Sequence, residues 1–291
     1  MAVLVAGFAW PLWHLARFAA GSDLYSYILV IPLASAGLVW LQHSDRPGPS
    51  APLRPLALGL LAAGAFALAA SAAGLVAGTE PAPPDTLILP ALAFVLFFAG
   101  ICAWFLGRLT VRAIAFPLVF LVFLSPLPLF LSNAFEFFLQ HASASVAGTF
   151  FDWSGLPVLR EGDLGFRLTD INLNVAPQCS GLHSSLALII TSLPAGYLFL
   201  RSPWHRAIFT LATIPIGIVR NGFRIFTVGE LCVHYGPQMI NSYIHRTGGW
   251  LFFLLSLVPF FLLLVLLMRL ERGRPEREKS RSAENILAGN P

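Results

Sequence analysis

Charged residues are scarce in this chain of 291 residues. Asp, Glu, Lys and Arg together make up 11%, whereas hydrophobic residues make up 57%, and the mean hydropathy is +0.76. A composition this poor in charge excludes an ordinary water-soluble globule and is typical of a polytopic membrane protein. The chain has a single lysine, Lys279, which lies near the C-terminus.

Cysteine is also rare, and several metal and protease motifs are missing. Cys102, Cys179 and Cys232 are far apart and form no C-x-x-C pair, so neither a zinc site nor a disulfide framework is indicated. No H-E-x-x-H sequence occurs, and no aspartate falls inside a long apolar run. An intramembrane aspartyl pair is therefore excluded, Glu230 with His234 is only a weak hint of a metal site, and we expect no metal and no other cofactor.

Long apolar runs are what the chain has in abundance. About eight runs of roughly 20 residues are each long enough to span a hydrocarbon core of about 30 Å. They lie near residues 2–20, 24–41, 56–77, 86–106, 113–131, 182–200, 207–228 and 249–269. We therefore predict an all-α polytopic membrane protein of about eight transmembrane helices. A single transmembrane domain is expected over residues 1–270, followed by a basic, disordered cytoplasmic tail over residues 271–291.

Arginines mark alternate connections between these runs. They are Arg46 and Arg54, Arg108 and Arg112, Arg201 and Arg206, and the basic residues of the tail from Arg269 to Arg281. Since positive residues next to spans are retained on the cytoplasmic side, both termini are predicted to be cytoplasmic. Topology then accounts for the net charge of +4, and no nucleic-acid partner is expected. No cleavable signal peptide is recognised at the N-terminus.

The longest predicted outer segment covers about residues 132–178. Apolar residues recur at helical spacing in its first part, up to Phe150, which predicts a helix lying in the membrane interface. Apolar and polar residues then alternate over 164–168 and again over 171–175. This alternation predicts a small β-hairpin that leads directly to Cys179 and to the sixth apolar run.

Cys179 is the candidate nucleophile. A cysteine just before a helix has backbone N–H groups and a positive dipole end nearby, which favour the thiolate. Ser180 follows it, and Pro177 and Gly181 shape the helix entry. Two alternatives remain open: Cys179 as a small buried apolar residue, and a structural disulfide between Cys179 and Cys232, both predicted on the oxidising outer side.

Arg220, Asn221 and Arg224 lie near the outer end of the seventh run, where polar residues at membrane depth commonly mark a functional cavity. His245 precedes the eighth run, so Cys179, Arg224 and His245 are all predicted at the outer face. A thiolate, a guanidinium for an oxyanion and a proton-carrying histidine suit acyl transfer through a thioester.

Other chemistry at that face is limited by what the chain contains. The only lysine, Lys279, falls in the predicted cytoplasmic tail, so a serine–lysine pair at the outer face is excluded. His183 and His234 remain rivals to His245 as the proton carrier, because His183 comes four residues after Cys179 and could share a helix face with it.

Three motifs of this chain resemble the signatures of the exosortase/archaeosortase family. They are A-P-Q-C-S-G-L at 176–182, R-N-G-F-R-I at 220–225 and H-x-x-G-G-W at 245–250, with weaker likeness at 23–27 and 125–128. The resemblance covers most of residues 20–270, and the order and spacing of the motifs make it specific. One departure is His183, because family members often carry an arginine shortly after the Ser-Gly pair.

The resemblance implies a multi-pass cysteine transpeptidase or protease of the plasma membrane, with Cys179, Arg224 and His245 as its catalytic residues. Its substrates would be exported proteins with a C-terminal sorting tail: a short motif such as PEP, a transmembrane helix and a basic cluster. The acceptor would be linked to surface polysaccharide or lipid and its assembly machinery. Two other classes stay open: a non-enzymatic transporter or assembly component for exported polymer, in which Arg220 and Arg224 bind an anion, and a membrane acyltransferase with lipid donors.

Overall fold

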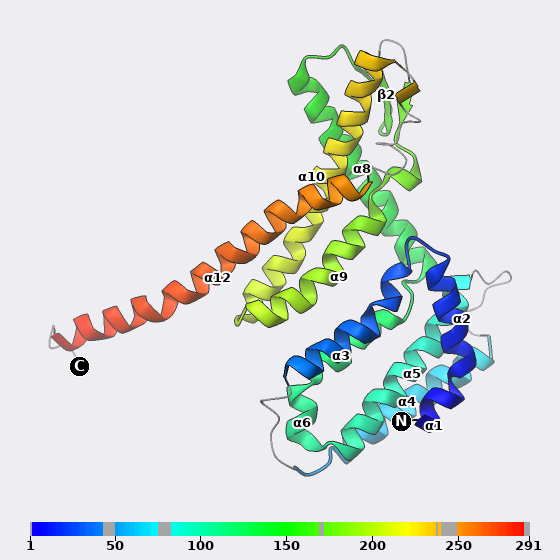
Figure 1. Ribbon diagram of the computed structural model, residues 1–291, viewed down its shortest axis with the longest axis vertical. Helices are drawn as coiled ribbons and strands as arrows, with labels where there is room; N and C mark the ends of the chain where they lie inside the picture. Colours follow the sequence, from blue (N-terminus) through cyan, green and yellow to red (C-terminus); the bar gives the residue numbers. More distant parts are fainter. Residues whose placement is uncertain are drawn as a thin grey trace. The chain divides into compact units, whose positions relative to one another are not determined.

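The computed structural model describes residues 2–42, 50–74, 83–168, 172–236, 238–239 and 249–287. Figure 1 shows a chain made almost wholly of helices, with one small sheet that includes the labelled strand β2. The chain divides into two compact units, Met1–Ala134 and Phe135–Pro291. The expected division into a domain over 1–270 and a tail over 271–291 stays a prediction.

The predicted class, an all-α polytopic membrane protein, is confirmed. Among the described residues, five helices are long and apolar enough to cross a membrane. They are α4 (Arg54–Ala72), α5 (Pro83–Phe105), α9 (Leu182–Phe199), α10 (Pro203–Tyr235) and α12 (Gly249–Leu287). A sixth span results if α6 (Gly107–Ala113) and the segment Ala115–Leu124, bent by 64°, are one crossing. Bends and breaks thus account for the difference from about eight runs.

The three remaining predicted runs form shorter helices. Residues 2–20 divide into α1 (Ala2–Gly7) and α2 (Ala9–Ala20), and residues 24–41 into the 3-10 helix η1 (Ser26–Leu29) and α3 (Ile31–Leu41). In the fifth run, α7 (Ala115–Phe120) passes into the 3-10 helix η3 (Leu121–Leu124). Each of these runs contains proline, which removes a helical hydrogen-bond donor and favours such interruptions.

The first unit is organised on the pair α4 and α5, which pack closely through small residues. The ring of Phe97 lies 3.3 Å from where a Cβ at Gly64 would be, and Leu61 lies 3.0 Å from the corresponding position at Gly100. Helix backbones can approach this closely in a membrane only where such side chains are missing. The contact therefore depends on glycine in both helices.

The second unit begins within α8 (Leu129–Ser154) and contains the sheet. Strands β1 (Leu159–Glu161), β2 (Gly165–Arg167) and β3 (Asn172–Asn174) are antiparallel in the order β1-β2-β3. The predicted hairpin is β2 and β3, which pair with Phe166 opposite Leu173. The sequence analysis missed β1, because all three of its residues are exposed and show no apolar alternation.

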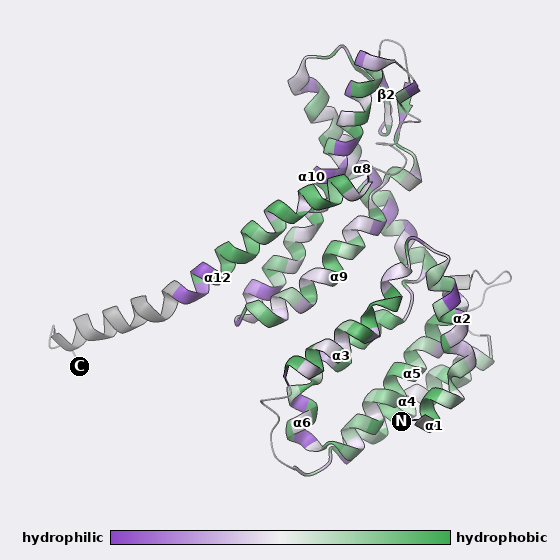
Figure 2. Cartoon of the chain, viewed as in Figure 1, coloured by the Kyte–Doolittle hydropathy of each residue, from purple (hydrophilic) through white to green (hydrophobic). Residues whose placement is uncertain are grey.

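Two apolar clusters hold the second unit together. In one, Phe151 of α8, Phe166 of β2 and Ile225 of α10 are buried together. In the other, Leu188 of α9, Phe209 of α10 and Phe260 of α12 are buried together. Figure 1 shows α9 lying along α10, with α12 packed against them. In Figure 2, α12 is hydrophobic over most of its coloured length, as a span in contact with lipid requires.

Candidate functional site

Cys179 ends a short 3-10 helix, η4 (Pro177–Cys179), two residues before α9 begins. The N–H of Cys179 donates to Ala176 O at 2.8 Å, and the N–H of Ser180 donates to Pro177 O at 3.0 Å. Cys179 is therefore held on a tight turn at the entry of α9, as the sequence predicted. Its side chain is half-buried, which leaves the sulfur accessible from one side.

Gly181 makes this turn possible. Its φ is +77°, a left-handed conformation that side chains with a Cβ adopt only at a cost. A Cβ at this position would also lie 2.8 Å from Cγ of Asn221 and 3.0 Å from Nη2 of Arg220. The backbone after Cys179 can approach α10 this closely only because residue 181 is glycine.

Asn221 and Arg220 of α10 bind the backbone of this turn. Nδ2 of Asn221, a side chain only 1% exposed, donates to Cys179 O at 2.7 Å. Nη2 of Arg220, also buried, donates to Gly181 O at 3.5 Å. Buried donors of this kind are stabilising only when paired, so their position fixes the turn that carries Cys179.

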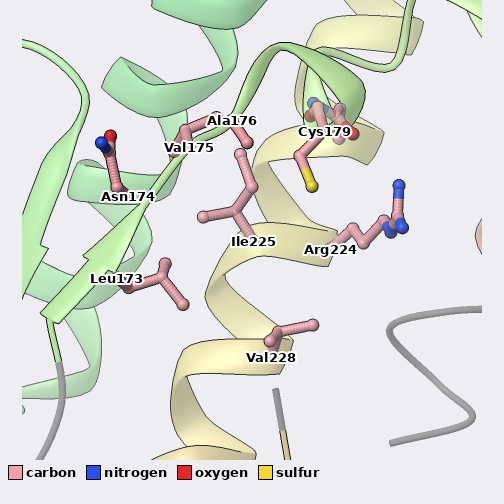
Figure 3. A pocket seen from close by; sticks show the side chains of 9 residues that line it. Leu173, Asn174, Val175, Ala176, Cys179, Arg224, Ile225 and Val228 are labelled. Atoms are coloured by element: carbon pink, nitrogen blue, oxygen red, sulfur yellow. The ribbon is translucent and has the colours of Figure 1, made fainter. Parts of the chain in front are cut away.

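A pocket of about 200 Å³ brings Cys179 and Arg224 together. It is lined by Leu173, Asn174, Val175, Ala176, Cys179, Asn221, Arg224, Ile225 and Val228. Figure 3 shows the Cys179 sulfur and the Arg224 guanidinium at the same end of this pocket, with Leu173, Ile225 and Val228 along its apolar part. The pocket thus joins one nucleophile and one cation to an apolar slot.

The other predicted site residues lie in different places. Ser180 is buried, and its Oγ accepts the N–H of Leu182, the first residue of α9, at 3.3 Å. His183 is exposed and does not line the Cys179 pocket; because Cys179 belongs to η4 and not to α9, the shared helix face that favoured His183 does not form. His234 contacts Glu230 at 3.3 Å on the exposed end of α10. His245 lies outside the described residues.

The sequence analysis missed the side chains that support the pocket from α8 and β3. Nε2 of Gln140, buried in α8, donates to Val175 O at 2.5 Å and so fixes the end of the strand that leads to η4. In the sequence, Gln140 is marked only by being a polar amide side chain within a mainly apolar helical pattern. In addition, α10 continues to Tyr235, so Arg224 lies about three turns before the helix ends rather than in its last turns.

Cys179 forms no disulfide in the structure, so the alternative of a Cys179–Cys232 disulfide is wrong. Cys232 is buried among the apolar residues of α8, β2 and α10, and Cys102 is buried in α5. Within the described parts of the chain, no three His, Cys, Asp or Glu residues are grouped as a metal site would require.

The pocket chemistry suits a cysteine nucleophile. The Arg224 guanidinium lines the same pocket as the Cys179 sulfur and can donate to an oxyanion that forms on a carbonyl attacked there. Beyond Arg224 the pocket is lined by apolar side chains, among them Leu173, Ile225 and Val228. This pocket contains the nucleophile and the cation that a cysteine acyl-transfer protein needs.

Comparison with protein families agrees with this class. Residues 13–262 match the transmembrane exosortase family (Exosortase_EpsH), and the chain therefore belongs to that family. The resemblance found in the three sequence motifs is thereby confirmed. Exosortases are generally cysteine transpeptidases whose substrates are PEP-CTERM proteins. Searches of curated proteins and of solved structures each gave no match.

Proposed function

We propose that this exosortase cleaves the C-terminal sorting tail of exported proteins through a thioester at Cys179 and transfers them to a surface acceptor. The observation that carries the proposal is the shared pocket of Cys179 and Arg224, on a turn that Asn221 and Arg220 hold by two hydrogen bonds. A residue kept only for packing would not need the turn that carries it to be anchored by two buried polar side chains.

The reaction has two acyl-transfer steps. The Cys179 thiolate attacks the scissile carbonyl carbon, and Arg224 stabilises the oxyanion of the tetrahedral intermediate. Collapse breaks the C–N bond, the leaving amine takes a proton from His245, and the thioester remains. An acceptor amine or hydroxyl, on polysaccharide or lipid, then loses its proton to His245 and releases the protein; water in its place gives hydrolysis.

The proposed site faces the outer side of the membrane, and both termini are cytoplasmic. The alternation of arginine-bearing connections supports this topology. A membrane-impermeant thiol reagent applied to intact cells should label Cys179, and it should leave the buried Cys102 unlabelled. Protection of Cys179 in intact cells, with labelling after lysis, contradicts the topology.

The direct test is to replace Cys179 with Ala in the native host and follow secreted proteins that carry a sorting tail. We expect them to accumulate uncleaved, while a Cys102→Ala variant, altered in the buried thiol of α5, processes them normally. Normal maturation in a Cys179→Ala variant that reaches the membrane, in a host without a second exosortase, contradicts the proposal. It would favour a transporter or assembly component in which Arg220 and Arg224 bind an anion.

A further inference from the structure

Strand β3 forms an edge of the sheet, since it pairs with β2 alone. The N–H of Val175 donates to Leu164 O at 3.0 Å, and Asn174 stands opposite Gly165 in the register. Residues of an antiparallel pair alternate between facing the partner strand and facing away from it. The N–H and C=O of Asn174 therefore point to the free edge, where none of the described residues bonds to them.

The Cys179 pocket runs along this free edge. Its lining includes four consecutive residues, Leu173 to Ala176, together with Ile225 and Val228 of α10. Its lining among the described residues includes none from β2. A second hollow, of about 510 Å³, differs because it is lined by residues of both β2 and β3. The pocket thus leads from the outward backbone of Asn174 to the sulfur of Cys179.

We infer that the substrate segment next to the scissile bond adds to the free edge of β3 as a fourth strand, with its backbone bonded to Asn174. This inference rests on the proposed function and names how that function recognises its substrate. An unpaired edge strand is a template for an extended peptide, whose main chain supplies affinity while pockets beside the edge select alternate side chains. Pairing at Asn174 places the adjoining peptide bonds of the substrate toward Cys179, five residues further along the chain.

Strand addition also explains how a motif with two prolines can bind. In an added strand, every second residue turns its N–H away from β3, and proline, which has no N–H, is accepted there. In a Pro-Glu-Pro sequence, such as the PEP-CTERM substrates imply, the glutamate N–H and C=O then face Asn174. The two proline rings lie on the same side as Leu173 and Val175, in the apolar part of the pocket.

The first test compares two substitutions of Asn174 in the full-length chain. Asn174→Pro and Asn174→Ala both remove the carboxamide, but only proline removes the outward N–H, and β2 pairing does not use that N–H. With a synthetic Pro-Glu-Pro peptide, KM of the proline variant should exceed that of the alanine variant by about three- to tenfold, the effect of one lost hydrogen bond. The alkylation rate of Cys179 should be equal in the two variants.

The second test needs no variant. Amide-to-ester replacements along the peptide, assayed with the wild-type enzyme, should reduce kcat/KM at alternate positions only, because every second N–H faces β3. Equal losses at all positions, or equal KM for the two Asn174 variants, overturn the inference. If instead Asn174→Pro changes the oligomeric state and not KM, a second copy occupies the edge and the inference is wrong. Cleavage by Cys179→Ala tests the proposed function separately.

Discussion

The two units of the molecule both contain buried or partly buried side chains that donate to backbone carbonyls, but the donors and their targets differ. In the first unit, short hydroxyls join helices: Ser35 donates to Pro117 O at 2.9 Å, and Ser125 donates to Ile88 O at 3.1 Å. In the second unit, longer amide and guanidinium groups, such as Asn221, reach the irregular turn around Cys179.

Polar side chains that join helices therefore differ in kind from polar side chains that hold the candidate site. A serine hydroxyl on a helix needs one acceptor and is satisfied inside a tight helix pair. A buried asparagine or arginine needs several partners, so it is stable only beside a segment with free carbonyls. Backbone of that kind occurs at membrane depth only where protein or a cavity surrounds it, and such a segment carries Cys179.

The largest effect is expected from Arg224→Lys. The variant keeps the positive charge in the pocket but loses the planar guanidinium that can donate twice to one oxyanion. Since loss of an oxyanion donor commonly lowers kcat by about 10²- to 10³-fold, cleavage of a sorting-tail peptide should fall by a similar factor. The measurement is kcat for purified enzyme in detergent or lipid.

Arg112→Lys in α6 is the matched control, because it makes the same exchange at an exposed position of the first unit. It should leave kcat unchanged. Comparable losses of kcat in both variants would mean that the chemistry is not confined to the second unit. Full activity of Arg224→Lys would mean that the guanidinium of Arg224 has no part in catalysis.

A smaller loss is expected from Gly181→Ala. Alanine at φ +77° costs about 1–2 kcal/mol, and its Cβ would meet Asn221 at 2.8 Å, which adds an overlap of about 1–3 kcal/mol. The turn should shift away from α10, so both the unfolding temperature and activity should decrease. Gly74→Ala in the first unit has a similar φ, +67°, but open space around it, so only the smaller strain should be measured.

Asn221→Leu sharpens the comparison further. The side chains are similar in size, so the main change is that the carbonyl of Cys179 loses its donor, at a cost of about 1–3 kcal/mol. We expect a lower unfolding temperature together with a changed alkylation rate of Cys179. Ser35→Ala removes a donor of the first unit from Pro117 O and should lower the unfolding temperature alone. An unchanged alkylation rate in Asn221→Leu would show that the hydrogen bond does not position the thiol.

Much of the fold follows from local pattern. Each of the eight apolar runs is helical, because run length and composition alone favour helices in lipid. The interruptions at Phe8, Val30 and Ile114 each lie two or three residues before a proline, and the last of them is the bend of 64° after α6. Strand β1 escaped prediction, since its pairing with β2 and not its own residues defines it.

The residues of the candidate site could be predicted from the sequence, but the hydrogen bonds that hold them in place could not. Motif and depth singled out Cys179 and Arg224, and the pocket brings them together. That Asn221 donates to Cys179 O, and that Gln140 holds the end of β3, depends on contacts across 42 and 35 residues of sequence. The catalytic part of His245 stays a prediction, because this residue lies outside the described ones.

The smallest effect on activity is expected at Glu271, which anchors the opposite end of α10. Its carboxylate, near the end of the span-length part of α12 (Gly249–Arg272), accepts the N–H groups of Arg201 and Ser202, each at 2.8 Å, and contacts Nδ1 of His205 at 2.8 Å. A negative charge at a helix N-terminus is also favoured by the helix dipole. Glu271→Gln removes the charge and one acceptor oxygen, so stability should fall by about 1–2 kcal/mol.

Activity per folded molecule of Glu271→Gln should remain unchanged, because Ser202 lies roughly 30 Å along α10 from Arg224 at 1.5 Å per residue. The unfolding temperature and kcat are measured on the same preparation. Glu230→Gln, which breaks the exposed pair with His234 on the same helix, is the control and should change the unfolding temperature little. A fall in kcat for Glu271→Gln would mean that α10 transmits strain along its length, and the division between anchoring and catalytic ends of the second unit would then be wrong.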